Sequence, residues 1–176
     1  MDYAPDQLPS DPGIAVGTPE SALVFSQETL PSDATGKVSF ILRASDPGNP
    51  RQFIDGQVYG ISYTWGAGGN PGSDFLSVLV HTLYTYTGTP TWWQHVQPVL
   101  SQYAKLYPFM RNIVDLSDYA SVQAHSAQVQ QVLRLPRHSP AYMPVTRDLS
   151  ASKLAMLLQW FADGMSEGTP LGGAVA

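Results

Sequence analysis

Residues 75–104, FLSVLVHTLYTYTGTPTWWQHVQPVLSQYA, contain the change of pattern that decides the fold. Up to Thr87 the segment is rich in Val, Leu, Thr and Tyr, as β-strands are, and Gly88–Pro90 then predicts a turn. After this turn, Trp, Tyr, Val and Leu recur every three or four residues, which is the period of an α-helix. Strand signals precede the turn and helix signals follow it, so we predict an α+β fold.

The same thirty residues contain no Asp, Glu, Lys or Arg, while six of them are Phe, Tyr or Trp. Charged residues make up 13% of the chain, where about 25% is usual. We expect this uncharged segment to be buried in the protein's own core. The alternative is an aromatic surface that contacts a partner or an apolar ligand.

The composition of the 176 residues excludes several classes of protein. The absence of Cys excludes disulfides, thiolate metal sites, a Cys nucleophile and a quinone built from a Cys side chain. A net charge of -5 and a pI near 5.1 argue against nucleic acid or a membrane surface as partner. We find no Gly-x-Gly-x-x-Gly, P-loop or Gly-x-Ser-x-Gly pattern, so no nucleotide cofactor is predicted.

Localisation is predicted from what the sequence lacks. No run reaches about 18 continuous apolar residues, the length that a membrane-spanning helix needs. The N-terminal residues have no basic start and no apolar core of signal-peptide length. We therefore expect a cytoplasmic protein.

The sequence predicts two modules between two tails. The β-rich module has the character of an antiparallel β-sandwich, with roughly four to seven strands, and a bundle of three or four helices follows it. The predicted boundaries are a flexible arm at 1–19, the β-rich module at 20–89, the helical module at 90–164 and a flexible tail at 165–176.

Short β-branched and aromatic runs mark the predicted strands. In Lys37–Arg43 the side chains of Val38, Phe40 and Leu42 share one face. The other strands are predicted at 22–26, at 58–65 with Tyr59, Ile61 and Tyr63 on one face, and at 75–87.

Capping residues set the predicted helix boundaries. Thr89 is expected to be an N-cap with Pro90 at the first helical position, and Pro98 should kink or split this helix. Ser117 and Asp118 can cap a second helix, which is expected to run through Leu133. Ser150 is expected to cap the final helix, and Gly164 is expected to end it.

The candidate catalytic residues lie in the helical module. Arg147 would anchor a carboxylate, and Asp148 or His95 would move a proton. A structural explanation is sufficient for Asp148, because it lies just ahead of a predicted helix N-terminus, where the helix dipole favours an acid. Candidate ligand-binding residues are the aromatic side chains of Trp92, Trp93, Tyr103, Tyr107 and Tyr142. At helical spacing such side chains more often form a core.

Two histidines are candidates for a metal or haem site. His81 lies in a predicted strand and His95 in a predicted helix. Neither belongs to a local metal-binding motif, so a hydrogen-bonded structural role is the simpler interpretation of each. Asp55 is the best candidate acid in the β-rich module, although a turn residue is again the simpler interpretation.

Part of the helical module resembles a known family. Tyr103–Met110 (YAKLYPFM) and Tyr142–Ser150 (YMPVTRDLS) are similar in order and spacing to a central segment of violacein-type iminophenylpyruvate dimer synthases, a resemblance that extends to the related chromopyrrolic acid synthases. His95–Leu100 (HVQPVL) is more loosely similar to amino-acid oxidases that carry a tryptophylquinone. The resemblance covers residues 92–162 and implies a setting in oxidative natural-product biosynthesis.

Two departures limit what the resemblance implies. The ferritin-like domain that follows this segment in the violacein-type enzymes is not in these 176 residues, and the quinone oxidases need a Cys that the chain lacks. The resemblance implies a place in the shared motif for four residues only: Tyr107, Tyr142, Arg147 and Asp148.

The expected function is therefore that of a small auxiliary or binding subunit in oxidative, amino-acid-derived natural-product biosynthesis. Its expected partners are another protein or a second copy, with an aromatic small molecule as a further candidate. The alternatives are a stand-alone enzyme that acts on an aromatic or amino-acid-derived metabolite, or a haem- or metal-binding protein. No particular cofactor is predicted.

Overall fold

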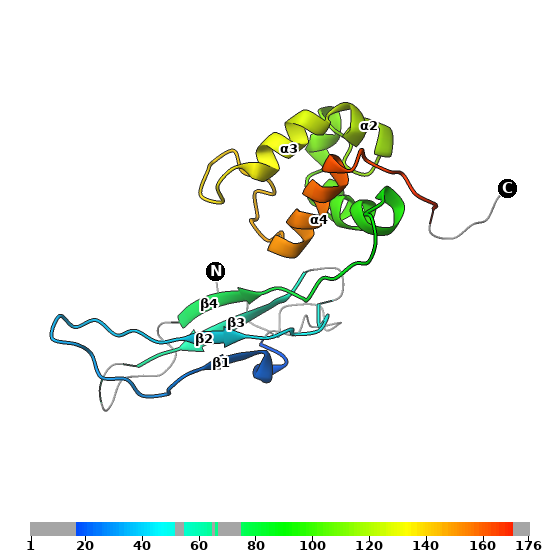
Figure 1. The fold of residues 1–176 in the computed structure, drawn as a ribbon. Helices are drawn as coiled ribbons and strands as arrows, with labels where there is room; N and C mark the ends of the chain where they lie inside the picture. The colour runs from blue at the N-terminus through cyan, green and yellow to red at the C-terminus, as the bar shows by residue number, and fades with distance from the viewer. Residues whose placement is uncertain (1–16, 52–54, 65, 67–74, 171–176) are drawn as a thin grey trace, which may run out of the picture. The chain divides into compact units, whose positions relative to one another are not determined.

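The computed structural model describes residues 17–51, 55–64, 66 and 75–170 (Figure 1). The chain divides into two compact units, Met1–Leu83 and Tyr84–Ala176. We call their described parts the β unit and the helical unit, because the strands precede this division and the α-helices follow it. The mixed α+β class predicted from the sequence is confirmed. None of the helices in the described ranges is long and apolar enough to cross a bilayer.

The β unit contains two antiparallel hairpins. β1 (Leu23–Phe25) pairs with β2 (Leu42–Ala44), and β3 (Gln57–Ser62) pairs with β4 (Phe75–Val80). A short 3₁₀ turn, η2 (Glu20–Ala22), leads into β1. One small hydrophobic cluster joins the hairpins, made of Ala22, Leu23, Tyr59 and Val80, with Leu42, Ile61 and Val78 packed against it. Tyr59 and Ile61, which were predicted to share one face, both belong to this cluster, whereas Tyr63 lies beyond β3 and is exposed.

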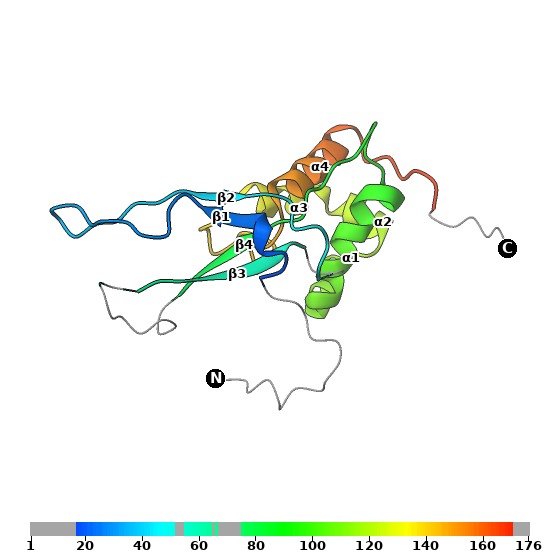
Figure 2. The same cartoon turned by 90° about the horizontal axis from the view of Figure 1, so that it is seen from below.

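The predicted strand at Lys37–Arg43 is wrong over most of its length. Regular pairing begins at Leu42, and residues 26–41 form a hairpin arm that extends well past the paired strands (Figure 2). At its tip, the Asp33 carboxylate accepts backbone N–H bonds from Thr35 and Lys37 at 2.8 and 2.9 Å. Phe40, predicted to share a face with Val38 and Leu42, is 40% exposed, and its neighbour Ile41 is 61% exposed, so no described element fully covers either side chain.

The predicted strand at Phe75–Thr87 ends early, at Val80. Beyond it, the Leu83 N–H donates to Asp46 Oδ1 at 3.0 Å, and the Thr82 hydroxyl donates to the Gly48 carbonyl at 2.8 Å. These bonds to the segment after β2 replace the strand ladder. Gly56 has a φ of +73°, and a Cβ there would lie 2.7 Å from the His81 Cα, so the chain passes the end of β4 only with glycine at this position.

The helical unit begins with η3 (Trp92–Val96), a turn of π-helix that continues into α1 (Gln97–Leu106). η4 (Pro108–Asn112), α2 (Tyr119–Ala124), α3 (Ser126–Arg134) and α4 (Ala151–Ala162) follow. The predicted start at Thr89 and Pro90 is wrong by two residues, since Thr91 is the residue that precedes the first helical turn. Pro98 lies in the first turn of α1, where π-helix gives way to α-helix, and the chain stays helical across this junction.

Three of the predicted caps are confirmed. The Asp118 side chain accepts from the Ser121 N–H at 2.7 Å, and the Ser150 hydroxyl accepts from the Lys153 N–H at 3.2 Å. Gly164 follows the last helix with a φ of +84°. The single helix expected from Asp118 to Leu133 is instead broken between α2 and α3, where the His125 backbone leaves the helical region.

Residues Met165–Gly168, which we call the C-terminal strap, lie in the part of the chain expected to be a flexible tail. The N–H groups of Trp92 and Trp93 donate to the carbonyls of Ser166 and Glu167 at 2.9 and 3.2 Å. The Trp160 indole donates to the Ser166 carbonyl at 2.8 Å. The strap thereby satisfies two N-terminal N–H groups of η3, which have no partner within their own helix.

The Tyr119 hydroxyl donates to the Met165 carbonyl of the strap at 2.8 Å. We expect this bond to contribute to the free energy of unfolding. Tyr119→Phe should destabilise the helical unit by about 1 kcal/mol, because it removes a part-buried hydrogen bond while keeping the ring. Urea unfolding followed by tryptophan fluorescence measures this loss. Tyr86→Phe is the matched control, and an equal loss in both variants would mean that the strap contributes nothing.

Candidate functional site

A small apolar cavity lies between α1, α3 and the loop Tyr142–Ser150. Its volume is about 70 Å³, which is roughly the volume of two water molecules in the liquid and too small for a planar ring system. The side chains that line it include Tyr103, Tyr107, Leu133, Met143 and Pro144. The cavity can accept one aliphatic group, so the sequence-predicted pocket for a planar aromatic ligand is not formed at this place.

The tyrosines of α1 tie the loop to the helix. The Tyr103 hydroxyl donates to Asp148 Oδ1 at 3.2 Å, and the Tyr107 hydroxyl accepts from the Thr146 N–H at 3.3 Å. Asp148 Oδ1 also accepts from the Thr146 hydroxyl at 2.5 Å. The two motifs that the sequence analysis singled out therefore meet in space. Tyr142 is buried, and its hydroxyl has no hydrogen-bond partner among the described residues.

Arg147 holds the loop in shape. Each nitrogen of its guanidinium donates to a carbonyl oxygen, Nε to Arg137 at 2.7 Å, Nη1 to Val145 at 2.8 Å and Nη2 to Ser139 at 3.3 Å. Its backbone has a φ of +57°, which is unfavourable for a residue with a Cβ. No ion pair with Asp148 occurs among the described residues. The geometry favours a structural role over the expected role of anchoring a carboxylate.

Trp92, Trp93 and His95 belong to the start of η3 and do not line the apolar cavity. Trp92 is fully buried and packs on the rings of Trp160 and Tyr119, with centroid distances of 5.8 and 5.7 Å. His95 Nδ1 accepts the Thr91 N–H at 3.0 Å, so its ring hydrogen is on Nε2 in the neutral form. Trp92 therefore serves the core, and His95 helps to satisfy the first helical turn.

His81 lies beside Asp55 in the β unit. His81 Nδ1 is 3.7 Å from Asp55 Oδ2, and the Asp55 side chain is only 5% exposed. The structure thus brings together the candidate acid and the candidate histidine of the β-rich module. Within the described ranges, no group of three or more His, Cys, Asp or Glu side chains is close enough to hold a metal ion.

Comparison with known proteins adds no relative to this description. No protein-family model, no curated protein and no solved structure matches the chain. The functional inference therefore depends on the geometry of the chain itself.

Sequence reasoning missed two surfaces. One is the exposed apolar surface of the β unit, because alternation identifies an apolar face without showing whether the chain covers it. The other is a polar cleft on α1. Its side chains at 97, 101 and 105 follow the i, i+4, i+8 spacing of one helix face, which was the available signal.

The role of Arg147 gives a second prediction. Arg147→Ala should lower the free energy of unfolding of the helical unit by about 0.5–1.5 kcal/mol, because three exposed loop carbonyls exchange a charged donor for water. Arg147→Lys should recover little of this loss, since an ammonium cannot reproduce the planar fork. Chemical denaturation measures both variants. An unchanged stability of Arg147→Ala would show that the guanidinium is available for a ligand.

Proposed function

We propose that the chain is an auxiliary binding subunit that docks on a partner protein through its β unit. In this proposal the two hairpins form a minimal sandwich-like docking module, and the helices form a separate bundle. The proposed setting is oxidative biosynthesis from amino acids. It depends only on the resemblance that residues 92–162 carry.

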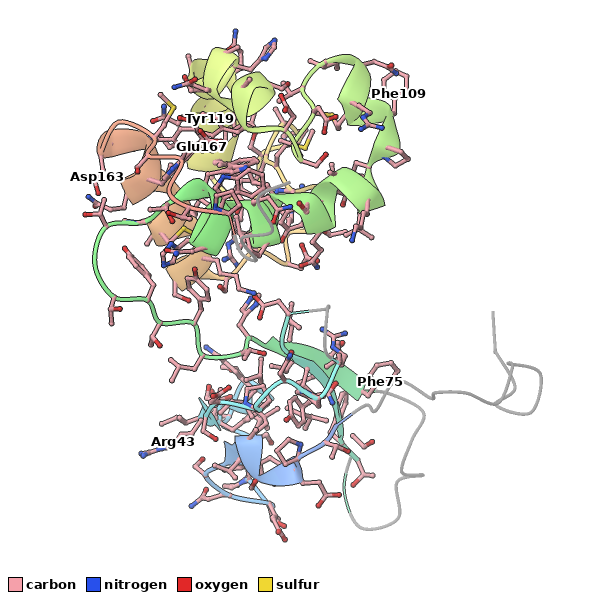
Figure 3. The ribbon with its side chains drawn as sticks, turned by 90° about the vertical axis from the view of Figure 1, so that its right-hand side faces the viewer. Arg43, Phe75, Phe109, Tyr119, Asp163 and Glu167 are labelled. Carbon is pink, nitrogen blue, oxygen red and sulfur yellow. The ribbon has the colours of Figure 1, made fainter. Side chains whose placement is uncertain are left out.

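The observation that carries the proposal is the imbalance between buried and exposed apolar side chains in the β unit. Its hydrophobic cluster has four buried members. A larger number of large apolar side chains is exposed on the same unit: Val24, Phe25, Val38, Phe40, Ile41, Tyr63, Phe75, Leu76, Leu79 and Leu83. Where exposed apolar side chains gather in one patch, they mark an interaction site. In Figure 3, Phe75 projects from the start of β4.

Strand pairing supports a protein as the partner. Each described sheet has only two strands, so each hairpin has backbone groups at its outer edges that another chain can pair with. Two-stranded hairpins are marginally stable alone and gain from an added strand or a covering surface. The partner chemistry that fits is therefore an apolar protein surface, with or without an exposed strand.

The hairpin arm is the most direct contact candidate. Phe40 and Ile41 are neighbours in sequence, and burying one such side chain fully contributes about 1.5–3 kcal/mol. The charged residues of the arm are Glu28, Asp33 and Lys37, and none of them is adjacent in sequence to Phe40 or Ile41. A small molecule is a less suitable occupant of the β unit, because the apolar cavity and the polar cleft are both lined by residues of the helical unit.

The alternatives receive less support from the geometry. A stand-alone enzyme that anchors its substrate on Arg147 would have to release a guanidinium that already donates to three carbonyls. A haem or metal site that uses His95 Nδ1 would break the bond from the Thr91 N–H.

The double variant Phe40→Asp/Ile41→Asp tests the proposal. In an extract of cells that make the protein, the native chain should elute from a sizing column in an assembly far larger than its 19.1 kDa. The double variant should elute near the monomer position, because association weakens at least about tenfold. Its melting temperature should stay within a few degrees, since both side chains are exposed.

Ser39→Asp is the matched control, because it adds a charge beside Phe40 without removing an apolar side chain. A native chain that elutes as a monomer in the extract would contradict the proposal. A purified chain that forms the same assembly by itself would also contradict it, because the occupant would then be a second copy.

A further inference from the structure

A polar cleft lies on a different face of α1 from the apolar cavity. Its volume is about 400 Å³, within the roughly 300–1,000 Å³ that small-molecule sites occupy. Gln97, Ser101 and Lys105 of α1 form one wall, Pro108 and Arg111 of η4 a second, and the turn at 114–117 a third. This cleft is unrelated to the docking surface proposed for the β unit.

Hydrogen-bond donors that have no partner among the described residues gather in the cleft. Lys105 makes no hydrogen bond or ion pair with a described residue, and Arg111 uses only its Nε, which donates to Asp115 Oδ2 at 2.7 Å. The Ser101 hydroxyl is shielded from solvent and likewise has no hydrogen-bond partner in the described part of the chain. The donors that a ligand in the cleft can reach are those of Lys105 and Arg111, since both side chains are exposed.

Asp115 orients Arg111 and does not compete for the ligand. Its Oδ1 accepts from the backbone N–H and the hydroxyl of Ser117, at 3.0 and 2.5 Å. These bonds, together with the Arg111 contact, lower the pKa of Asp115 to about 2. The carboxylate therefore stays charged from about pH 4 upward, and the cleft keeps two cations against one anion over that range.

The floor of the cleft is apolar. Met110, Val114 and Leu116 line both the cleft and the apolar cavity, so they form the partition between the two. Met110 is flexible and can adapt its side chain to an apolar group that enters from the cleft. A ligand that fits would place an anionic end near the cations and an apolar end on this floor.

We propose that the cleft binds a small organic carboxylate with a short apolar arm. The carboxylate accepts from Lys105 and from the free end of the Arg111 guanidinium. A guanidinium presents paired donors that match the two oxygens of a carboxylate. The apolar arm lies on Met110 and Leu116.

Three probes that differ only in the polar end test this proposal: 3-phenylpropionate, 3-phenylpropanamide and 3-phenylpropylammonium. Calorimetry and amide chemical shifts of the full-length chain measure their binding. We expect the carboxylate to bind at least about tenfold more tightly than the amide, and the ammonium not to bind. The affected amides should be those of Ala104, Lys105, Arg111 and Ser117. Binding should fade below about pH 4, as the probe's own carboxyl is protonated.

Matched variants locate the site. Lys105→Gln should weaken 3-phenylpropionate binding about tenfold, because it removes one of the two cations. Lys37→Gln removes the same charge from the β unit and should leave binding unchanged. Equal affinity for the amide, equal loss in Lys37→Gln, or no binding of the carboxylate at about 10 mM would each overturn the proposal, while the docking behaviour of the hairpin arm would be unaffected.

Discussion

Closure of the helical unit by the C-terminal strap is the constraint on which the rest of that unit depends. The first turn of a helix has N–H groups with no partner in the helix. Here the carbonyls of Ser166 and Glu167 accept two of them, and Ser166 also accepts the Trp160 indole N–H. These bonds fix the start of η3 against the end of α4, with the buried Trp92 ring between them.

Because the start of η3 is fixed, the orientation of α1 is fixed too. Different faces of α1 then line the apolar cavity and the polar cleft. One face presents Tyr103 and Tyr107 to the apolar cavity and holds the loop Tyr142–Ser150. Another presents Ser101 and Lys105 to the polar cleft. The β unit lacks a comparable closure within its described residues, since its hairpins share one small cluster and leave most of their apolar side chains exposed.

Part of the fold could be predicted from the sequence, because some of its features depend only on neighbouring residues. Asp118, Ser150 and Gly164 act at helix ends through bonds or dihedrals within a few residues, so the sequence identified them. The start at Trp92 was placed wrongly, because its N–H groups are satisfied by carbonyls more than seventy residues later. The meeting of Tyr103 with Asp148 was suggested by motif order, whereas the loop-holding role of Arg147 depends on a positive φ that no pattern reveals.

The central claim is that the helical unit is complete in itself while the β unit needs a partner. Hydrogen exchange of the purified chain, compared with the chain in its native assembly, tests it most directly. In the purified chain, amides of β1 and β2 should exchange roughly a hundredfold faster than those of α4, and they should slow in the assembly. Equal protection of β1, β2 and α4 in a purified monomer would contradict the claim.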